Sequence, residues 1–425
     1  MSSVLWYQVK NFGSFGEEGG YVDLTTTSKD KHRDLWYNNG NHNINIVTAI
    51  MGANGSGKTT LIKPIPYLNY LFWRIPEKNT DDLFLNFNRF SASPTVIDIS
   101  FLLDGKEYTY KLSACPLMIF LEELYVKNSR NQKTYVFKRE ITEASLATVT
   151  GFYEKEYDKD EFDEENILDK IKYSYSVKES LFTLTNKDVE RVAPNCVLIS
   201  EARRLNDPLA TNIAKSFRCL ANVNFIGRFT RNDSDLSTIA GRLYRRPQRF
   251  EIIKSILKKW DLGLNDVRLK KNETIDDDGK NKVKYSLYGV HVNKEGEEIE
   301  LPFIFESAGT KNALIRLNDI MLSIENGNPC VIDELGDDLH PHMIKPILEL
   351  FIDPEINSKK SQLIFTCHRP ELINYLGKYR IVICEKKQNE SESFRLDEFP
   401  SSDARVADNL AAKYLAGAFG GVPDL

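Results

Sequence analysis

Short apolar runs separated by turn residues dominate the first 140 positions of the chain. Such runs are typical of β-strands. The dipeptide Asp104-Gly105 lies between two of them and is a strong signal for a two-residue hairpin turn. The first part of the chain is therefore expected to be rich in strands, which are predicted at residues 5–9, 21–24, 44–50, 94–103, 107–112, 122–126 and 134–138.

The pattern changes beyond residue 140. Helical character prevails from about 140 to 260, where the acidic stretch 154–165 is typical of a solvated surface. A second hairpin is predicted around Asp278-Gly279, and buried strands are predicted at 329–334 and 362–366. Strands thus alternate with helices, which predicts an α/β fold. We divide the chain into residues 1–139, a mostly helical insertion with a β-hairpin at 140–300, and residues 301–425.

The strand predicted at 44–50 leads into Gly-Ala-Asn-Gly-Ser-Gly-Lys-Thr, which matches the phosphate-binding pattern G-x-x-x-x-G-K-[ST]. Its glycines allow backbone N–H groups to surround phosphates at the N-terminus of the helix expected from Thr59. Lys58 would reach the β- and γ-phosphates, and the Thr59 hydroxyl would bind Mg²⁺. The sequence therefore predicts that ATP and Mg²⁺ are bound by Gly52, Asn54, Gly55, Ser56, Gly57, Lys58, Thr59 and Thr60.

Two later strands end in residues suited to nucleotide hydrolysis. The first ends in Asp333 and Glu334. Asp333 would hold Mg²⁺ through water beside Thr59, and Glu334 would orient or deprotonate the attacking water. The second leads to His368, which would contact the γ-phosphate or that water, because the carboxyl ends of strands in α/β sheets bind ligands. Glu334, His368 and Lys58 are therefore the predicted catalytic residues.

A Ser-x-Gly turn formed by Ser307, Ala308, Gly309 and Thr310 opens a further predicted helix. It would present a hydroxyl and backbone N–H groups to an anion. Because the sequence contains one phosphate loop, we expect this turn to contact the γ-phosphate held by a second copy of the protein. The alternative is a plain helix cap by Ser307.

Composition narrows the class of protein. The chain has 425 residues, a net charge of −5 and 41% hydrophobic residues, which fits a soluble enzyme of one or two domains. No apolar run approaches the ~20 residues that span a bilayer, and the N-terminus lacks the features of a secretory signal. The six cysteines include no C-x-x-C pair, so reduced thiols are expected. These features predict a cytoplasmic protein that does not contact membranes.

Asn54 within Gly-x-Asn-Gly-x-Gly-Lys-Thr-Thr is similar to the loop of ABC- and SMC-type ATPases. Over nearly its whole length the chain resembles AAA-family ATP-binding proteins of bacterial abortive-infection systems, which are RloA- and AbiL-like relatives of the OLD nuclease ATPase. The resemblance also rests on Lys10-Asn11-Phe12-x-Ser14-Phe15, on Asp333-Glu334-Leu335-x-x-x-Leu339-His340-Pro341, and on Tyr414-Leu415-x-Gly417-x-Phe419-Gly420-Gly421-Val422-Pro423.

This resemblance implies an α/β, ABC-type P-loop ATPase head with a mixed sheet, an antiparallel β subdomain and a largely helical insertion. It identifies residues 52–60 as Walker A and residues 307–310 as the signature loop, acting in trans. Asp333 and Glu334 correspond to Walker B, and His368 corresponds to the switch histidine. ATP hydrolysis at a nucleotide-bridged dimer or larger homo-oligomer is the activity that these motifs imply.

Two positions depart from the family's pattern. The D-loop would be formed by Asp337, Asp338 and His340, and Asp338 replaces the usual small residue there. No Q-loop glutamine stands between the phosphate loop and residue 94, where Asn86 and Asn88 are the nearest substitutes.

A basic segment of the insertion carries Arg242, Arg245, Arg246 and Arg249. Basic residues with interleaved aromatics are typical of nucleic-acid contacts. A solvated helix face and a surface for an acidic partner protein are the alternatives.

The resemblance implies antiphage defence, in which the ATPase controls a separately encoded effector, a toxin or nuclease. Too few residues follow His368 for the C-terminal nuclease of OLD-type proteins, so toxic chemistry is expected in a partner. One alternative is an ATPase of DNA repair or recombination that acts directly on DNA. Another is a regulatory scaffold that binds ATP and hardly hydrolyses it.

Overall fold

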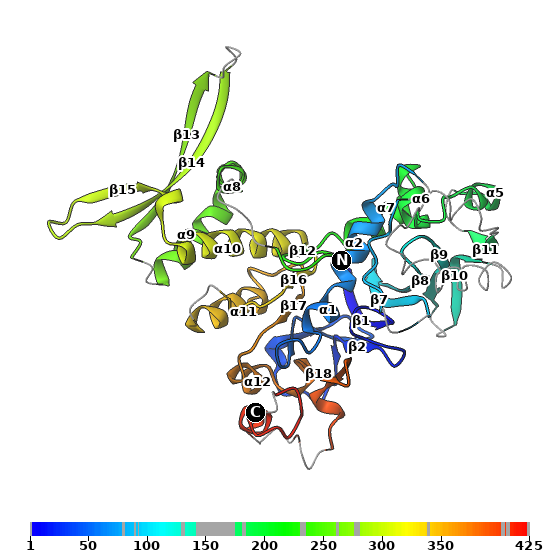
Figure 1. Ribbon diagram of the computed structural model, residues 1–425. Helices are drawn as coiled ribbons and strands as arrows, with labels where there is room; N and C mark the ends of the chain where they lie inside the picture. Colours follow the sequence, from blue (N-terminus) through cyan, green and yellow to red (C-terminus); the bar gives the residue numbers. More distant parts are fainter. Residues whose placement is uncertain are drawn as a thin grey trace, which may run out of the picture.

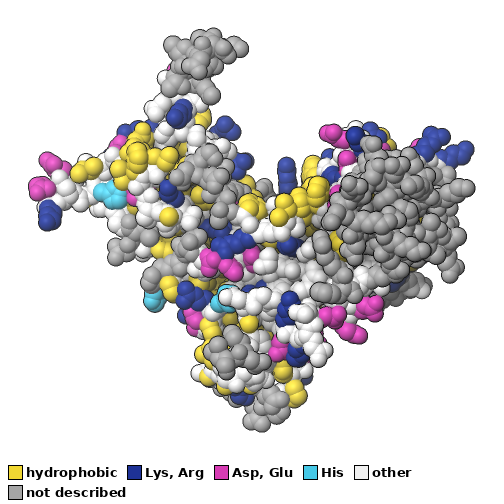
Figure 2. Space-filling view, viewed as in Figure 1, with side chains coloured by type: hydrophobic (Ala, Val, Ile, Leu, Met, Phe, Trp, Pro, Cys, Tyr) yellow, Lys and Arg dark blue, Asp and Glu magenta, His cyan; other side chains and the backbone are white. Residues whose placement is uncertain are grey.

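A computed structural model of the chain describes residues 2–78, 81–88, 91, 93–128, 132–141, 175–180, 184–229, 235–260, 263–275, 281–337, 341–400, 404 and 409–422. The acidic stretch 154–165, the Asp278-Gly279 turn, Asp338 and His340 lie outside these residues. Two lobes diverge from a common base (Figure 1), and the surface between them is hollowed into a notch (Figure 2).

One lobe is built on a seven-stranded sheet with the order β11-β10-β9-β8-β7-β1-β2, in which every neighbouring pair is antiparallel. Asp104 and Gly105 have φ angles of 50° and 78°, the left-handed values that a two-residue hairpin turn requires. The predicted hairpin and the pairing of the first two strands are confirmed. The strands are β1 (Ser2–Lys10), β2 (Gly20–Asp23), β7 (Thr95–Leu103), β8 (Lys106–Ala114), β9 (Ile119–Lys127), β10 (Lys133–Ile141) and β11 (Tyr175–Ser180).

The common base contains a six-stranded mixed sheet with the order β12-β16-β17-β6-β18-β19. Its first five strands are parallel and β19 is antiparallel to β18. These strands are β6 (Val47–Met51), β12 (Leu220–Ala221), β16 (Cys330–Ile332), β17 (Leu363–Thr366), β18 (Ile381–Lys387) and β19 (Glu390–Arg395). The single strand predicted at 44–50 is wrong, because the chain bends at Ile46. Its first part belongs to a small sheet of β3 (Thr25–Thr26), β4 (Trp36–Asn38) and β5 (Asn43–Asn45).

Alternating residues of the mixed sheet enter two different cores, because successive side chains of a strand point to opposite faces. Ile50, Val331 and Ile364 pack with the antiparallel lobe and with the helices that follow the phosphate loop. Ala49 and Ile332 pack on the other side. Helices of the first face are α1 (Lys58–Ile62), α2 (Pro64–Trp73), α6 (Leu198–Arg204) and α7 (Pro208–Ser216); those of the second include α10 (Ala308–Asn326), α11 (Ile344–Ile352), α12 (Glu371–Leu376) and α13 (Leu410–Leu415).

The described part of the range 140–300 is divided between the two lobes. Strand β11 and the helix α5 (Asn186–Glu190) lie with α6 and α7 in the antiparallel lobe. The other lobe carries α8 (Asp235–Tyr244), α9 (Pro247–Lys259) and an antiparallel arm of β13 (Asp266–Ile275), β14 (Asn281–Val292) and β15 (Glu298–Pro302), which projects from the molecule (Figure 1). The predicted second hairpin corresponds to β13 and β14. Among the described helices, none combines the length and apolarity needed to cross a membrane.

Candidate nucleotide-binding site

The phosphate loop joins the end of β6 to the start of α1, as its motif predicts. Gly52, Gly55 and Gly57 have φ angles of 150°, 76° and 105°, which residues with a side chain rarely adopt. A Cβ atom on Gly52 would lie 2.2 Å from the Cys384 carbonyl oxygen, and one on Gly57 would lie 2.6 Å from Ser391 Oγ. Two of these glycines are therefore required by close packing as well as by the backbone conformation.

Lys58 is 6% exposed, and its ammonium group lies against the start of this loop. Its ammonium group donates hydrogen bonds to the carbonyl oxygens of Gly52 at 3.0 Å and Ala53 at 2.8 Å. Burial lowers the pKa of Lys58, while nearby acids including Glu334 and Asp333 oppose that shift. The lysine is therefore held by the backbone where a phosphate would meet it.

Thr59 and Asp333 come together although 274 positions separate them in the sequence. Thr59 Oγ1 donates to Asp333 Oδ2 at 2.9 Å, and Thr366 Oγ1 donates to Asp333 Oδ1 at 2.7 Å. A hydroxyl and a carboxylate are the hard oxygen ligands that Mg²⁺ prefers beside nucleotide phosphates. The side chains present therefore fit the predicted ion, with Thr59 and Asp333 as its protein partners.

Glu334 lies directly after Asp333 and has a φ angle of 51°, an uncommon backbone conformation for a residue with a side chain. Its N–H donates to Thr366 Oγ1 at 2.7 Å, which fixes the turn. A hydrogen bond with Asp337, reinforced by burial, raises the pKa of Glu334. His368 Nε2 lies 4.0 Å from Glu334 Oε1, and burial together with Lys58 lowers the pKa of His368. The three residues predicted for catalysis, Lys58, Glu334 and His368, thus converge on one place.

Sequence comparison places the chain among known proteins. Residues 47–374 match the model of a family described as AAA domain, putative AbiEii toxin, Type IV TA system. The chain belongs to this AAA-domain family. No curated protein matches it. The mixed sheet with its phosphate loop, beside a separate antiparallel sheet, gives the chain an α/β P-loop fold.

Solved structures of similar arrangement include an SMC head bound to the C-terminal winged-helix domain of ScpA, with a TM-score of 0.42 and 12% identity over 92% of this chain and 97% of that one. An SMC head from Pyrococcus yayanosii, with a coiled coil and joint, has a TM-score of 0.44 and 11% identity. The match covers 98% of this chain and 100% of that one. The recombination mediator protein RecF has a TM-score of 0.36 and 9% identity. The match covers 92% of this chain and 98% of that one.

In this AAA-domain chain, Arg228 is a site residue that sequence reasoning missed. Its Nη1 atom lies 2.5 Å from Glu334 Oε2 and 2.5 Å from Asp337 Oδ2. Asn222 anchors the same segment, since its Oδ1 accepts from Asp333 N at 2.7 Å and its Nδ2 donates to Asp333 O at 2.9 Å. No sequence pattern marks Arg228, because its partners lie more than a hundred positions away.

Replacing Arg228 with Ala is expected to lower ATP turnover about tenfold, the effect of about 1.4 kcal/mol on a barrier. Arg228 lowers the pKa of Glu334, so its loss should raise that pKa further. Because a base works only when deprotonated, the acid limb of the pH–rate profile should move to higher pH. Steady-state assays from pH 5 to 9 test this, with Arg228→Lys expected to restore part of the rate. An unchanged rate and profile in Arg228→Ala would exclude a role for this contact.

The two candidate Q-loop substitutes differ in position. A Cβ atom on Gly13 would lie 2.8 Å from Asn86 Nδ2 and 3.2 Å from Thr60 Oγ1, so the Asn86 amide is a neighbour of the phosphate-loop helix. Asn88 is 2% exposed and donates to the Phe15 carbonyl oxygen at 3.1 Å. Asn86 is therefore the residue placed near the loop, and Asn88 stabilises the bend of residues 11–16.

The predicted signature residues lie at the N-terminus of α10. Ser307 is the N-cap, and its Oγ accepts from Thr310 N at 3.1 Å. Ser307 and Ala308 are exposed. Figure 1 shows that this end of α10 lies beside the arm, far from α1. Within one subunit the signature residues therefore do not join the phosphate loop.

The basic segment does not form one surface. Arg242, Arg245 and Arg246 are exposed at the end of α8 and the following turn. Arg249 is only 4% exposed, and its Nε donates to Glu325 Oε1 of α10 at 2.7 Å. The expectation that Arg249 lies on a partner surface is wrong, because α9 turns this side chain towards α10.

The C-terminal glycine motif lies against the phosphate loop. A Cβ atom on Gly421 would come within 3.6 Å of Gly52 Cα, and the Tyr414 hydroxyl donates to the Gly421 carbonyl oxygen at 3.0 Å. Gly421 has a φ angle of 69°. This contact gives the motif a position at the site, which its sequence alone did not indicate.

Proposed function

We propose that this protein binds and hydrolyses ATP at a site completed by a second copy of the chain, and that it thereby controls a separate effector. The convergence of Thr59, Asp333 and Glu334 at the end of the parallel strands carries the proposal. In open α/β sheets this edge is where ligands bind. The family's description, which names a toxin and a toxin–antitoxin system, supports a role in defence.

In this proposal the protein's own residues bind the phosphates, hold the ion and activate the water. The N–H groups of residues 52–57 and the Lys58 ammonium bind the phosphates, and Thr59 and Asp333 hold Mg²⁺. The ion, when bound, would neutralise charge on the phosphates. Glu334 accepts a proton from water, and His368, neutral because of its lowered pKa, orients that water or the γ-phosphate. Arg228 keeps the Glu334 carboxylate in place until the water arrives.

The second copy would supply Ser307 and its neighbours. The exposed N-terminus of α10 offers a hydroxyl and N–H groups to a phosphate, and it is too far from the phosphate loop of its own subunit to reach it. Beside it, the side chains of Ile304 and Phe305 are 51% and 71% exposed. Exposed apolar residues next to a predicted contact are typical of a protein interface. These features favour a homodimer or larger homo-oligomer around ATP.

Replacing Ser307 with Arg tests this assembly. The variant should bind ATP with the affinity of a single wild-type subunit. It should neither assemble around ATP nor hydrolyse it, because the arginine side chain would block the contact between the signature turn and the γ-phosphate of the other subunit. Sedimentation velocity with and without ATP measures assembly, and release of phosphate measures hydrolysis. Ser255→Arg, at an exposed position on α9, is the matched control. ATP-dependent assembly that survives in Ser307→Arg would remove the case for a site shared between subunits.

A direct action on DNA is the second candidate. It is favoured by the exposed Arg242, Arg245 and Arg246, and by Tyr244, whose ring lies 4.8 Å from that of Tyr285 on the arm. Basic and aromatic side chains together suit nucleic acid. ATP-dependent binding of duplex DNA that is lost on charge reversal of Arg245 and Arg246 would support this candidate over effector control. Co-purification of the native protein with a toxin or nuclease would support the first.

A further inference from the structure

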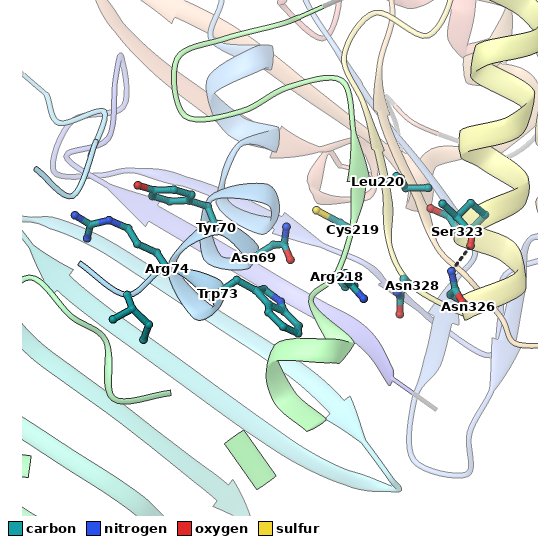
Figure 3. A pocket seen from close by; sticks show the side chains of 12 residues that line it. Asn69, Tyr70, Trp73, Arg74, Arg218, Cys219, Leu220, Ser323, Asn326 and Asn328 are labelled. Atoms are coloured by element: carbon teal, nitrogen blue, oxygen red, sulfur yellow. Dashed lines mark hydrogen bonds between the residues drawn. The ribbon is translucent and has the colours of Figure 1, made fainter. Parts of the chain in front are cut away.

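A pocket of about 760 Å³ lies away from the phosphate loop, between α2, the segment that enters β12 and the C-terminal end of α10 (Figure 3). Its volume falls in the range of sites for small ligands. Neither the phosphate loop nor the signature turn contributes to its wall. The residues predicted for ATP binding and hydrolysis therefore do not account for it.

The wall of this pocket has a distinct chemical character. It combines the aromatic side chains of Tyr70 and Trp73 with the guanidinium of Arg218 and with three amides, those of Asn69, Asn326 and Asn328. No carboxylate occurs among the described residues that line it. Figure 3 shows these side chains drawn from three separate segments around one space. The pocket thus offers an aromatic ring covered by guanidinium groups, amide groups and positive charge without a competing acid.

Trp73 and Arg218 form the centre of this arrangement. The Arg218 guanidinium carbon lies 5.0 Å from the centroid of the Trp73 ring, and the indole Nε1 donates to the Ala214 carbonyl oxygen at 3.1 Å. Within the described residues Arg218 forms no ion pair, and its side chain is exposed. The indole is therefore fixed, and Arg218 keeps its charge available to an anion.

Asn69 adds an unsatisfied acceptor to the wall. Its Oδ1 atom is buried and has no hydrogen-bond partner. A buried polar atom without a partner is destabilising, and a donor from an occupant would satisfy it. Exocyclic and ring N–H groups of nucleobases are donors of this kind.

We propose that the pocket binds a nucleotide unit, with its base beside Trp73 and the asparagine amides and its phosphate at Arg218. Bases stack on aromatic rings and on guanidinium planes, and arginine pairs with phosphate more strongly than with neutral groups. A free nucleotide and a nucleotide within single-stranded nucleic acid share this chemistry. An apolar ligand would leave Arg218 and Asn69 without partners.

The position of the pocket connects it to the ATPase elements. Helix α2 follows the phosphate-loop helix α1, β12 pairs with β16 next to Asp333, and α10 begins at the signature turn. An occupant would contact all three segments at their ends remote from ATP. The proposed second nucleotide site thus lies at the junction of α2, β12 and α10.

The experiment uses the full chain carrying Lys58→Ala, so that the phosphate loop does not contribute. Probes are the four ribonucleoside monophosphates, followed by equilibrium dialysis, and a fluorescent 12-mer of oligo(dT), followed by anisotropy. Saturable binding of at least one probe is expected, weakened tenfold or more by Arg218→Glu. Asn69→Leu, of similar size, should weaken it as well, because it removes the acceptor that the base N–H groups would use. Monophosphate binding would identify a free nucleotide, and binding of the oligomer alone would identify single-stranded nucleic acid.

Arg33→Glu, at an exposed arginine outside both the pocket and the basic segment, is the control and should leave binding unchanged. Absence of saturable binding by every probe would overturn the proposal. Binding that survives both pocket substitutions, or that is lost in Arg33→Glu instead, would also overturn it. These outcomes are separate from the ATPase proposal, which depends on Lys58 and Glu334.

Discussion

Replacing Glu334 with Gln is expected to lower ATP turnover by about 10²–10⁴-fold, the usual contribution of a general base. The amide keeps the size of the side chain but cannot accept a proton from water. Nucleotide binding should persist, because the phosphate-loop N–H groups and Lys58 are unchanged. The ATP-bound oligomer should therefore accumulate, which sedimentation velocity in ATP and Mg²⁺ would detect beside a phosphate-release assay.

Glu392 on β19 is exposed and provides the matched control. Glu392→Gln makes the same chemical change away from the site, and it should hydrolyse ATP at the wild-type rate. Hydrolysis at the wild-type rate by Glu334→Gln itself would show that another group activates the water. Retention of both binding and the oligomer with a reduced rate would instead agree with the assigned role.

Replacing Lys58 with Ala is expected to weaken ATP binding on the order of 100-fold. The ammonium would make charge-assisted hydrogen bonds to the β- and γ-phosphates, and one or two such bonds at about 1.5–3 kcal/mol each give this loss. Calorimetric titration with ATP and Mg²⁺ measures the affinity directly. Because burial already lowers the pKa of Lys58, its removal should not destabilise the fold, and the melting temperature checks this.

Lys387→Ala is the control for this change, since Lys387 is an exposed lysine at the end of β18. It should bind ATP with the wild-type affinity. If Lys58→Ala bound ATP as tightly as the wild type, the loop could not be the main phosphate site. A loss of affinity for ADP as well as ATP is also expected, because Lys58 would contact the β-phosphate.

Local patterns in the sequence determined several parts of this protein. The phosphate loop was predictable because its strand, glycines, lysine and helix are contiguous. Neighbouring residues therefore specify the backbone φ and ψ angles that the loop needs. The hairpin at Asp104-Gly105 was predictable for the same reason, since both residues must adopt left-handed φ angles. Asp333 and Glu334 could be assigned because they end a short buried strand, whose direction fixes which edge of the sheet they occupy.

Only the tertiary structure decided which distant side chains meet. Arg228 contacts Glu334, and Asn222 holds the backbone of Asp333, across separations of 106 and 111 residues. The sequence places Arg249 in a basic segment, yet the orientation of α9 buries it against Glu325. Such pairings depend on how helices and sheets pack, which residue type and local spacing do not specify. The sequence by itself thus determined the phosphate loop and the acidic strand end, whereas the packing of segments far apart in the chain decided the surroundings of Glu334.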